Sequence, residues 1–165
     1  MTGMDAALTG LANEVAVIGE VGAQRAFELA VAVLCGTILG ADRRIHGSAA
    51  GMRTCTLVCL GAVLYTHIGD SLIATHGLGD PTRIPGQIIT GIGFLGAGAI
   101  IHVGRNVSGL TSAAVIWFVG SIGVLIGSGY PLTATVAVVT IVFLMRVLGR
   151  VERRLLPRPP SGDGA

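Results

Sequence analysis

Five apolar segments joined by short polar connections are the feature that most restricts how this chain can fold. A helix needs about 20 mostly apolar residues to cross the hydrocarbon of a bilayer, with a lower limit of about 17. The segments that reach or approach this length cover residues 26–41, 54–75, 84–103, 110–128 and 131–148. The connections are too short to hold a folded extramembrane domain. The sequence therefore predicts an all-α fold, a polytopic bundle of five transmembrane helices in a lipid bilayer.

Composition supports a membrane protein and excludes several other classes. Charged residues make up 12% of the 165 residues and hydrophobic residues 52%, whereas a soluble domain usually carries about 25% charged residues. The 26 glycines show no three-residue period, which excludes collagen. The basic residues form no run with interleaved aromatic residues, so we expect no nucleic-acid partner. The three cysteines lie in or beside apolar segments, and their odd number favours packing over a disulfide framework.

The two ends of the chain differ from its apolar middle. Residues 1–25 lack the basic start and apolar core of a signal peptide, and we expect them to form an extracytoplasmic segment. Their apolar residues have a weakly helical spacing, which leaves both an interfacial helix and a frayed end open. Residues 26–149 form the predicted membrane domain. Residues 150–165 are basic and then rich in proline and glycine, which predicts a disordered cytoplasmic tail.

The arginines are distributed unequally between the two sides of the predicted bundle. With five spans, one side holds only Arg25 and Arg83. The other side holds Arg43, Arg44, Arg53, Arg105, Arg150, Arg153, Arg154 and Arg158. Arg146, in the last turns of the fifth span, can extend its side chain to that same side. Because arginine-rich loops stay in the cytoplasm, we predict an outer amino terminus and a cytoplasmic carboxyl terminus.

Ionisable residues at membrane depth gather near the predicted outer surface. Glu28 lies one turn inside the first span, His67 and Asp70 share a face of the second, and Arg83 enters the third. One interpretation is a cation or proton site, because carboxylate oxygens are ligands that Mg²⁺ prefers. The alternative is that both carboxylates are hydrated or pair with Arg25 and Arg83. The candidate metal ligands are thus Glu28 and Asp70, and no firm metal site or cofactor is predicted.

The predicted third span begins and continues with distinctive local patterns. Asp80-Pro81-Thr82-Arg83 reads as a helix start, with Asp80 or Thr82 as the cap. The glycine-rich stretch that follows, residues 91–101, contains G-x-G-x-x-G. A dinucleotide site would need a preceding strand and an acidic residue about twenty positions later, and both are missing, so we exclude nucleotide binding.

Glycines recur at helical spacing in three of the predicted spans. Gly93 and Gly96 lie in the third span, and pairs four residues apart occur in the first (36 and 40) and the fourth (123 and 127). Small residues let another helix backbone approach closely in a membrane. We therefore expect packing seams at these positions. A pore or a discontinuous helix at the glycines of the third span is the alternative.

The predicted cytoplasmic connections carry a second set of polar residues. Asp42 and Arg43 end the first span and Arg53 precedes the second. We expect the arginines to anchor the inner interface, and Ser108 or Thr111 to cap the fourth span. Between the spans, no nucleophile stands near a base and no Walker or histidine-rich metal motif occurs, which predicts a protein that is not an enzyme. Trp117 lies mid-span, where we expect neighbouring helices to pack against it.

Several short motifs, taken in order, resemble those of the MgtC/SapB family of bacterial inner-membrane proteins, over about residues 28–130. No single motif decides this, but the ordered set is specific. The matching motifs are Gly40-Ala41-Asp42-Arg43-Arg44, Ala50-Gly51-Met52-Arg53-Thr54, Asp80-Pro81-Thr82-Arg83-Ile84, Gly91-Ile92-Gly93-Phe94-Leu95-Gly96-Ala97-Gly98, Asn106-Val107-Ser108-Gly109-Leu110-Thr111-Ser112-Ala113-Ala114 and Ile116-Trp117.

The resemblance concerns the membrane domain only, and longer family members add a soluble carboxyl-terminal domain. It implies adaptation to low magnesium and survival inside host macrophages. Family members have been called magnesium transporters, and some look like regulators of a membrane complex. The partners this implies are a membrane complex, such as the ATP synthase or the machinery of phosphate uptake, or a small regulatory membrane peptide. A second copy of the chain is a further candidate. The family's first-span acidic residue matches Glu28 and its functional loop asparagine matches Asn106. The candidate functional residues are Glu28, Asp42, Arg43, Arg53, Asp80, Arg83, Gly93, Gly96, Asn106, Thr111 and Trp117.

Overall fold

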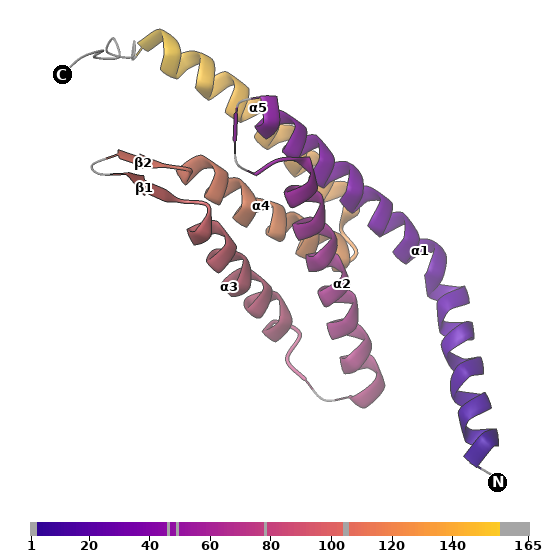
Figure 1. Ribbon diagram of the computed structural model, residues 1–165. Coiled ribbons are helices and arrows are strands. Elements are labelled where there is room, and N and C mark those ends of the chain that lie inside the picture. Colours follow the sequence, from indigo (N-terminus) through magenta and orange to yellow (C-terminus); the bar gives the residue numbers. More distant parts are fainter. Residues whose placement is uncertain (1–2, 46, 49, 78, 104–105, 156–165) are drawn as a thin grey trace.

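The fold is a bundle of helices with one short β-hairpin (Figure 1). The computed structural model describes residues 3–45, 47–48, 50–77, 79–103 and 106–155, with side chains described from residue 22 onward except over 101–106. Its elements are α1 (Gly3–Ile45), α2 (Met52–His76), α3 (Arg83–Gly98), β1 (Ile101–Val103), β2 (Asn106–Ser108), α4 (Leu110–Gly127) and α5 (Pro131–Leu155). Across these residues the prediction of a five-helix bundle is confirmed, and the hairpin is an addition to it.

Four of the helices are long and apolar enough to cross a membrane. They are α2, α4, α5 and the part of α1 that runs from Gly22 to Ile45. The chain is therefore a multi-pass membrane protein. The helix α3 has 16 residues, which gives it a length of about 24 Å, and it is the shortest of the five.

The predicted third span is wrong at its carboxyl-terminal end. A single helix was expected over residues 84–103, but α3 ends at Gly98 and Ile101–Val103 forms the strand β1. This strand pairs antiparallel with β2, with Ile101 opposite Ser108. Glycine weakens a helix end, and the β-branched residues after it favour an extended backbone. Hydropathy does not separate the two states, because an apolar strand and an apolar helix end score alike.

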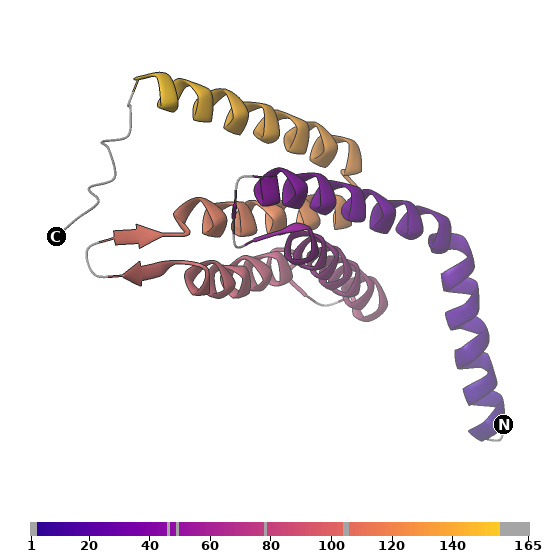
Figure 2. The ribbon, with the colours of Figure 1, turned by 45° about the horizontal axis from the view of Figure 1, so that its top comes forward.

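Both terminal helices extend beyond the predicted spans. The helix α1 is continuous from Gly3 and changes direction in its amino-terminal half (Figure 2). The helix α5 continues past Leu148 to Leu155. The start of the predicted disordered tail, residues 150–155, is therefore helical, because this stretch holds strong helix formers and the prolines begin only at Pro157. Residues 156–165 lie outside the described part of the chain.

The helix α4 is the centre of the bundle. It contacts each of the other four helices, and 50% of its span is buried, against 11% for α5. Both views show α3 beside α4 (Figures 1 and 2). The three cysteines Cys35, Cys55 and Cys59 are free and buried in this core, which confirms that they serve as packing residues.

Glycines bring the helices α1, α2 and α4 into close contact. A side-chain carbon added at Gly36 would lie 2.6 Å from the Thr56 backbone, and one added at Gly123 would lie 2.5 Å from the Cys59 carbonyl oxygen. Gly40 and Gly127 meet α2 in the same way. The expected packing seams of the first and fourth spans are therefore confirmed.

Candidate functional site

Two polar clusters are built around buried carboxylates of α1. The Glu28 cluster consists of Glu28, Gln24 and His67, and the Asp42 cluster consists of Asp42, Arg43 and Arg146. Glu28 and Asp42 lie about 21 Å apart along the helix axis. Each carboxylate therefore has its own set of partners near one end of the spanning part of α1.

The Glu28 cluster joins α1 to α2. Glu28 is 3% exposed. Its Oε2 lies 2.6 Å from Nε2 of His67, and its Oε1 accepts a hydrogen bond of 3.1 Å from Gln24. Next to it, Arg25 donates a hydrogen bond of 2.9 Å to Ser71 on α2. A buried carboxylate is tolerated when both oxygens have such partners, and here a histidine supplies the shorter contact.

The structure brings together only part of the polar group predicted from the sequence. Glu28 and His67 meet, whereas Asp70 and Arg83 are exposed. Within the described residues, neither Asp70 nor Arg83 forms a hydrogen bond or ion pair with that buried pair. Arg25 binds Ser71 and not a carboxylate. No group of three or more His, Cys, Asp or Glu side chains arranged for a metal ion occurs in the described part of the chain.

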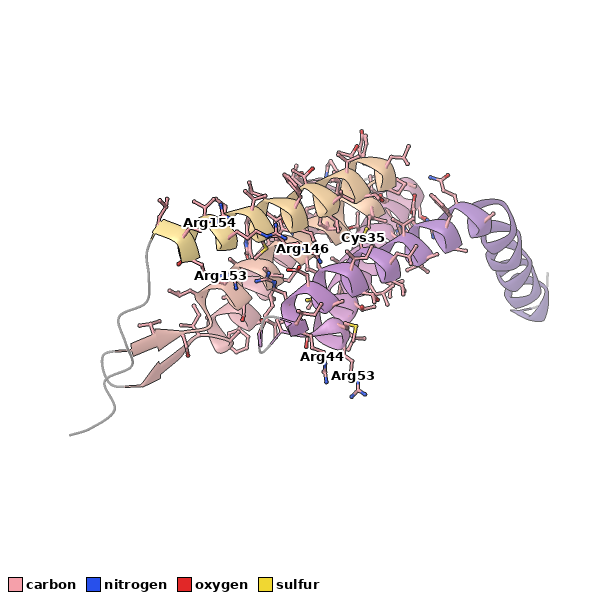
Figure 3. All side chains as sticks on the ribbon, turned by 90° about the horizontal axis from the view of Figure 1, so that it is seen from above. Cys35, Arg44, Arg53, Arg146, Arg153 and Arg154 are labelled. Atoms are coloured by element: carbon pink, nitrogen blue, oxygen red, sulfur yellow. The ribbon has the colours of Figure 1, made fainter. Side chains whose placement is uncertain are left out.

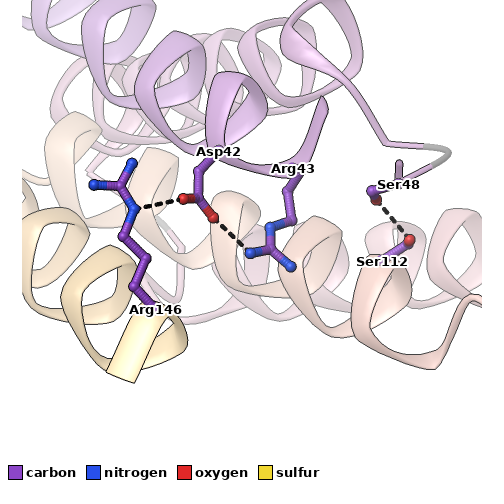
Figure 4. A network of polar contacts seen from close by, with 5 residues as sticks. All are labelled: Asp42, Arg43, Ser48, Ser112 and Arg146. Carbon is purple, nitrogen blue, oxygen red and sulfur yellow. Dashed lines mark hydrogen bonds and ion pairs between the residues drawn. The ribbon is translucent and has the colours of Figure 1, made fainter. Parts of the chain in front are cut away.

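The Asp42 cluster joins α1 to α5. Asp42 is 2% exposed; its Oδ2 accepts a hydrogen bond of 2.5 Å from Nη2 of Arg43, and its Oδ1 accepts one of 3.0 Å from Nε of Arg146. Figure 4 shows the carboxylate held between the two guanidinium groups. The helix α1 continues to Ile45, so Asp42 and Arg43 lie in its last turn as expected, but both side chains are buried against the bundle.

The connection between α1 and α2 is fixed to the start of α4. The hydroxyl oxygens of Ser48 and Ser112 lie 2.7 Å apart (Figure 4). The expected cap of α4 by Ser108 or Thr111 is wrong. The capping position is Gly109, with φ +88° and no side-chain cap bond, because this left-handed conformation is one that glycine adopts readily.

A cavity rich in arginine lies beside the Asp42 cluster, between the ends of α1, α4 and α5. We call it the arginine cavity; its volume is about 920 Å³. Its lining residues are Arg43, Ile45, Thr111, Met145, Arg146, Leu148, Gly149, Arg150, Glu152 and Arg153. Figure 3 shows Arg146 and Arg153 on α5, whereas Arg44 and Arg53 project away from that helix. Thus Arg43 and Thr111 face this cavity, while the exposed Arg53 lies outside it.

The predicted start of α3 is confirmed, but without the expected cap bond. The capping position is Thr82, and its side chain makes no bond to the helix. Oδ1 of Asp80 instead accepts hydrogen bonds from the Thr82 hydroxyl (2.7 Å) and backbone N–H (2.8 Å). These bonds, the side-chain one foremost, lower the pKa of the exposed Asp80 carboxyl. Asp80 therefore closes the turn before α3.

The two candidate glycines of α3 have different surroundings. Gly96 is buried, and an added side-chain carbon there would lie 3.5 Å from the Ala113 carbonyl oxygen on α4. Gly93 is exposed, and no atom of another part of the chain lies within 4 Å of the corresponding position. The expected seam is thus confirmed at Gly96 and wrong at Gly93. The helix α3 is continuous through both residues, and the predicted span is interrupted only after Gly98.

Two further candidate residues lie on α4 and in the hairpin. Trp117 is 49% exposed, so the rest of the chain covers only about half of this side chain. Asn106 begins β2 and pairs with Val103, while its side chain lies outside the described residues.

Comparisons with known proteins relate the chain to one family. A sequence model of the MgtC family matches residues 29–154. Protein MgtC of Brucella abortus (strain 2308) is 42% identical over 126 residues, which are 74% of this chain and 52% of that protein. Protein MgtC of Salmonella typhimurium (strain 14028s) is 40% identical over 136 residues, 82% of this chain and 57% of that protein.

A third relative carries a description of its own. YhiD of Escherichia coli (strain K12), described as a candidate magnesium transporter, is 41% identical over 119 residues, 68% of this chain and 55% of that protein. The chain spans little more than half the length of these relatives. No solved structure matches it.

Proposed function

Since the chain belongs to the MgtC family, we propose that it is a non-enzymatic regulator in the bacterial inner membrane, which acts under magnesium limitation by contacting another membrane protein. The family resemblance extends this proposal to survival inside host cells. The observation that supports it most directly is a face of α3 that is built for close helix contact and is not covered by the chain itself.

This open α3 face consists of Gly86, Thr90, Gly93 and Ala97. The four residues are exposed and follow one another at intervals of four, three and four, which places them on one side of the helix. Side-chain carbons added at Gly86 or Gly93 would meet no other part of the chain within 4 Å. Helices associate in lipid through small residues that let their backbones approach. The face therefore suits a helix from another protein.

An apolar groove lies between α2 and α3, on a different side of α3 from this face. Its volume is about 400 Å³. Its lining residues are Leu57, Val58, Gly61, Ala62, Tyr65, Ile84, Gln87, Ile88, Gly91, Ile92 and Leu95. A side-chain carbon added at Gly61 or Gly91 in this lining would also meet no other part of the chain within 4 Å. The groove is therefore a second apolar surface of α3, separate from the open α3 face.

Capture of a partner tests the proposal. The tagged full chain would be purified from bacteria starved of magnesium in several mild detergents, and co-purified membrane proteins would be identified. We expect a membrane complex such as the ATP synthase, a small membrane peptide, or a second copy of the chain. Chemical cross-linking with two differently tagged copies separates the last case from the others. Recovery of no membrane partner in any detergent would contradict the proposal.

We also propose that all five helices cross the membrane. Gly123 and Gly127 of α4 contact Cys59 and Thr66 of α2 in the same order, so α2 and α4 run in the same direction. A chain that leaves α2 must then return across the bundle before α4 begins. The helix α3 lies on that route, and its length of about 24 Å reaches most of the way across a hydrocarbon core of about 30 Å.

The proposed orientation places the amino terminus outside and the carboxyl terminus in the cytoplasm. It rests on the arginine-rich ends of α1 and α5, which lie toward one end of the molecule (Figure 1). A cysteine at the exposed position His76 should react with an impermeant reagent added to intact cells. One at the exposed position Arg154 should react only after permeabilisation. The native cysteines are buried and give little background, and the reverse labelling pattern would contradict the orientation.

A second candidate function is transport of Mg²⁺ or another cation. It is favoured by the buried carboxylate of Glu28 within a membrane-length helix and by the description of the relative YhiD. Purified protein in liposomes would be tested for Mg²⁺ flux. Flux that Glu28→Gln abolishes would favour transport over regulation, and Asp70→Asn would show whether the second candidate ligand belongs to the same path. No flux above protein-free liposomes would count against it.

A further inference from the structure

The arginine cavity carries an excess of positive charge that the mechanism proposed above does not use. Four arginines line it, at positions 43, 146, 150 and 153. The carboxylates beside them are Glu152 in the lining and Asp42 behind it. Four guanidinium groups therefore face two carboxylates, and the balance favours an anion in the cavity.

The arginines approach the cavity from two helices in a fixed arrangement. On α5 the positions 146, 150 and 153 are spaced by four and three residues, so they share one helical face. From α1, Arg43 is buried and held by Asp42, which also holds Arg146. Each guanidinium has five N–H donors, and the bonds to Asp42 use a single nitrogen of each. Donors remain for a ligand on side chains that are already positioned.

Among the residues that the structure describes, Arg150 forms no ion pair, and Arg153 bonds only the backbone carbonyl of Gly149. The planar guanidinium group presents paired N–H donors that match the oxygens of a phosphate group. Arginine is therefore well suited to bind phosphate. The same cavity has an apolar wall of Ile45, Met145 and Leu148. A phosphate that is attached to an acyl chain would use both parts of the lining.

We propose that the arginine cavity binds a phosphate group, carried by an anionic phospholipid of the surrounding leaflet or free in solution. Basic pockets between membrane helices are known to hold the headgroups of anionic lipids. A bound headgroup would bridge α1 and α5, whose direct contact at this end is the pair of Asp42 and Arg146. The inference concerns the chain alone and does not depend on the partner proposed above.

The test uses the purified full chain and phosphatidylglycerol as the anionic lipid. Native mass spectrometry would count lipids retained from an equimolar mixture of phosphatidylglycerol and phosphatidylcholine. The variant is Arg150→Gln with Arg153→Gln, which leaves the Asp42 cluster intact. The matched control is Arg44→Gln with Arg53→Gln, which removes the same charge from exposed positions outside the cavity. A second arm measures the melting temperature with inorganic phosphate against chloride at equal ionic strength.

We expect the wild type and the Arg44/Arg53 control to retain phosphatidylglycerol over phosphatidylcholine, and the Arg150/Arg153 variant to retain about tenfold less of it. If inorganic phosphate raises the melting temperature of the wild type and the control but not of the variant, free phosphate is also a ligand. Equal losses in both double variants would show that only overall charge matters. That result would overturn the proposal. So would a wild type that retains both lipids equally and whose melting temperature does not respond to inorganic phosphate.

Discussion

The region formed by α1, α2 and α4 and the helix α3 use the same small residues in different ways. In the first region the glycines at the helix contacts are closed, since Gly36 and Gly123 bring neighbouring backbones so near that no side chain fits. On α3 only Ile92 and Gly96 are buried, and glycines such as Gly93 face open space. The first region is a finished packing arrangement, whereas α3 offers a surface of the same kind with nothing from the chain packed on it.

This difference separates stability from function. Substitutions in the closed region should change how well the protein folds, because they alter contacts within the chain. Substitutions on the open face should leave folding unchanged and alter only what the protein binds. The following changes test that division, beginning with the largest expected effect on stability.

Asp42→Asn should have the largest effect on stability, through the contact of the closed region with α5. It removes the anion between Arg43, which is buried, and Arg146. Breaking a buried ion pair by removing one partner lowers the free energy of unfolding by about 3–5 kcal/mol. Thermal unfolding of the purified protein in detergent would measure this. The exposed Asp70 provides the control, since Asp70→Asn should change stability by less than about 0.5 kcal/mol.

Gly36→Ala should have the next largest effect. The new methyl group would lie 2.6 Å from the Thr56 Cα and 3.0 Å from the Cys55 carbonyl oxygen, so the two helix backbones would have to move apart. Overpacking of this kind lowers the free energy of unfolding by about 1–3 kcal/mol. A melting temperature equal to that of the wild type would show that α1 and α2 are not closely packed here.

Glu28→Gln should be milder than Asp42→Asn, although both remove a buried carboxylate. The partner of Glu28 is the single ring of His67, whereas Asp42 lies between two guanidinium groups that stay charged. A glutamine can also retain one hydrogen bond to the ring. We expect a loss of about 1 kcal/mol in the same unfolding measurement. A loss as large as that of Asp42→Asn would contradict this difference between the two clusters.

Gly96→Ala marks the boundary between the two regions. An added carbon would lie 3.5 Å from the Ala113 carbonyl oxygen, which is an ordinary van der Waals distance. We therefore expect a change of less than about 0.5 kcal/mol in the free energy of unfolding. A melting temperature far below that of the wild type would show that α3 is as closely packed on α4 as the helices of the closed region are on one another.

The helices and their order could be predicted from the sequence, because length and hydropathy decide which segments suit a bilayer. The hairpin after α3 could not, since its apolar residues satisfy the same criterion as a helix end. The burial of Asp42 was also missed. A charged residue after an apolar run is assigned to the interface, and its partner Arg146 is distant in the sequence. The β-branched residues Ile100, Ile101 and Val103 favour a strand, but hydropathy alone does not register that preference.

The spacing of the glycines predicts close packing but not which glycine is covered. Their spacing in α1, α3 and α4 predicts close packing, and it does so equally for Gly36, Gly93 and Gly123. Which of these faces is covered depends on where neighbouring helices lie, and spacing within one helix holds no information on that. The open face of α3 could therefore be identified only from the three-dimensional arrangement.

Gly93→Leu tests the central claim most directly, because it fills the open α3 face without touching another part of the chain. The measurement is the amount of membrane partner captured from magnesium-starved cells, together with the melting temperature of the same preparation. Thr140→Leu, at an exposed position of α5, is the matched control. We predict an unchanged melting temperature for both variants and loss of the partner only with Gly93→Leu. Full capture of the partner by Gly93→Leu, or a melting temperature well below that of the control, would contradict the assignment of this face as a docking surface.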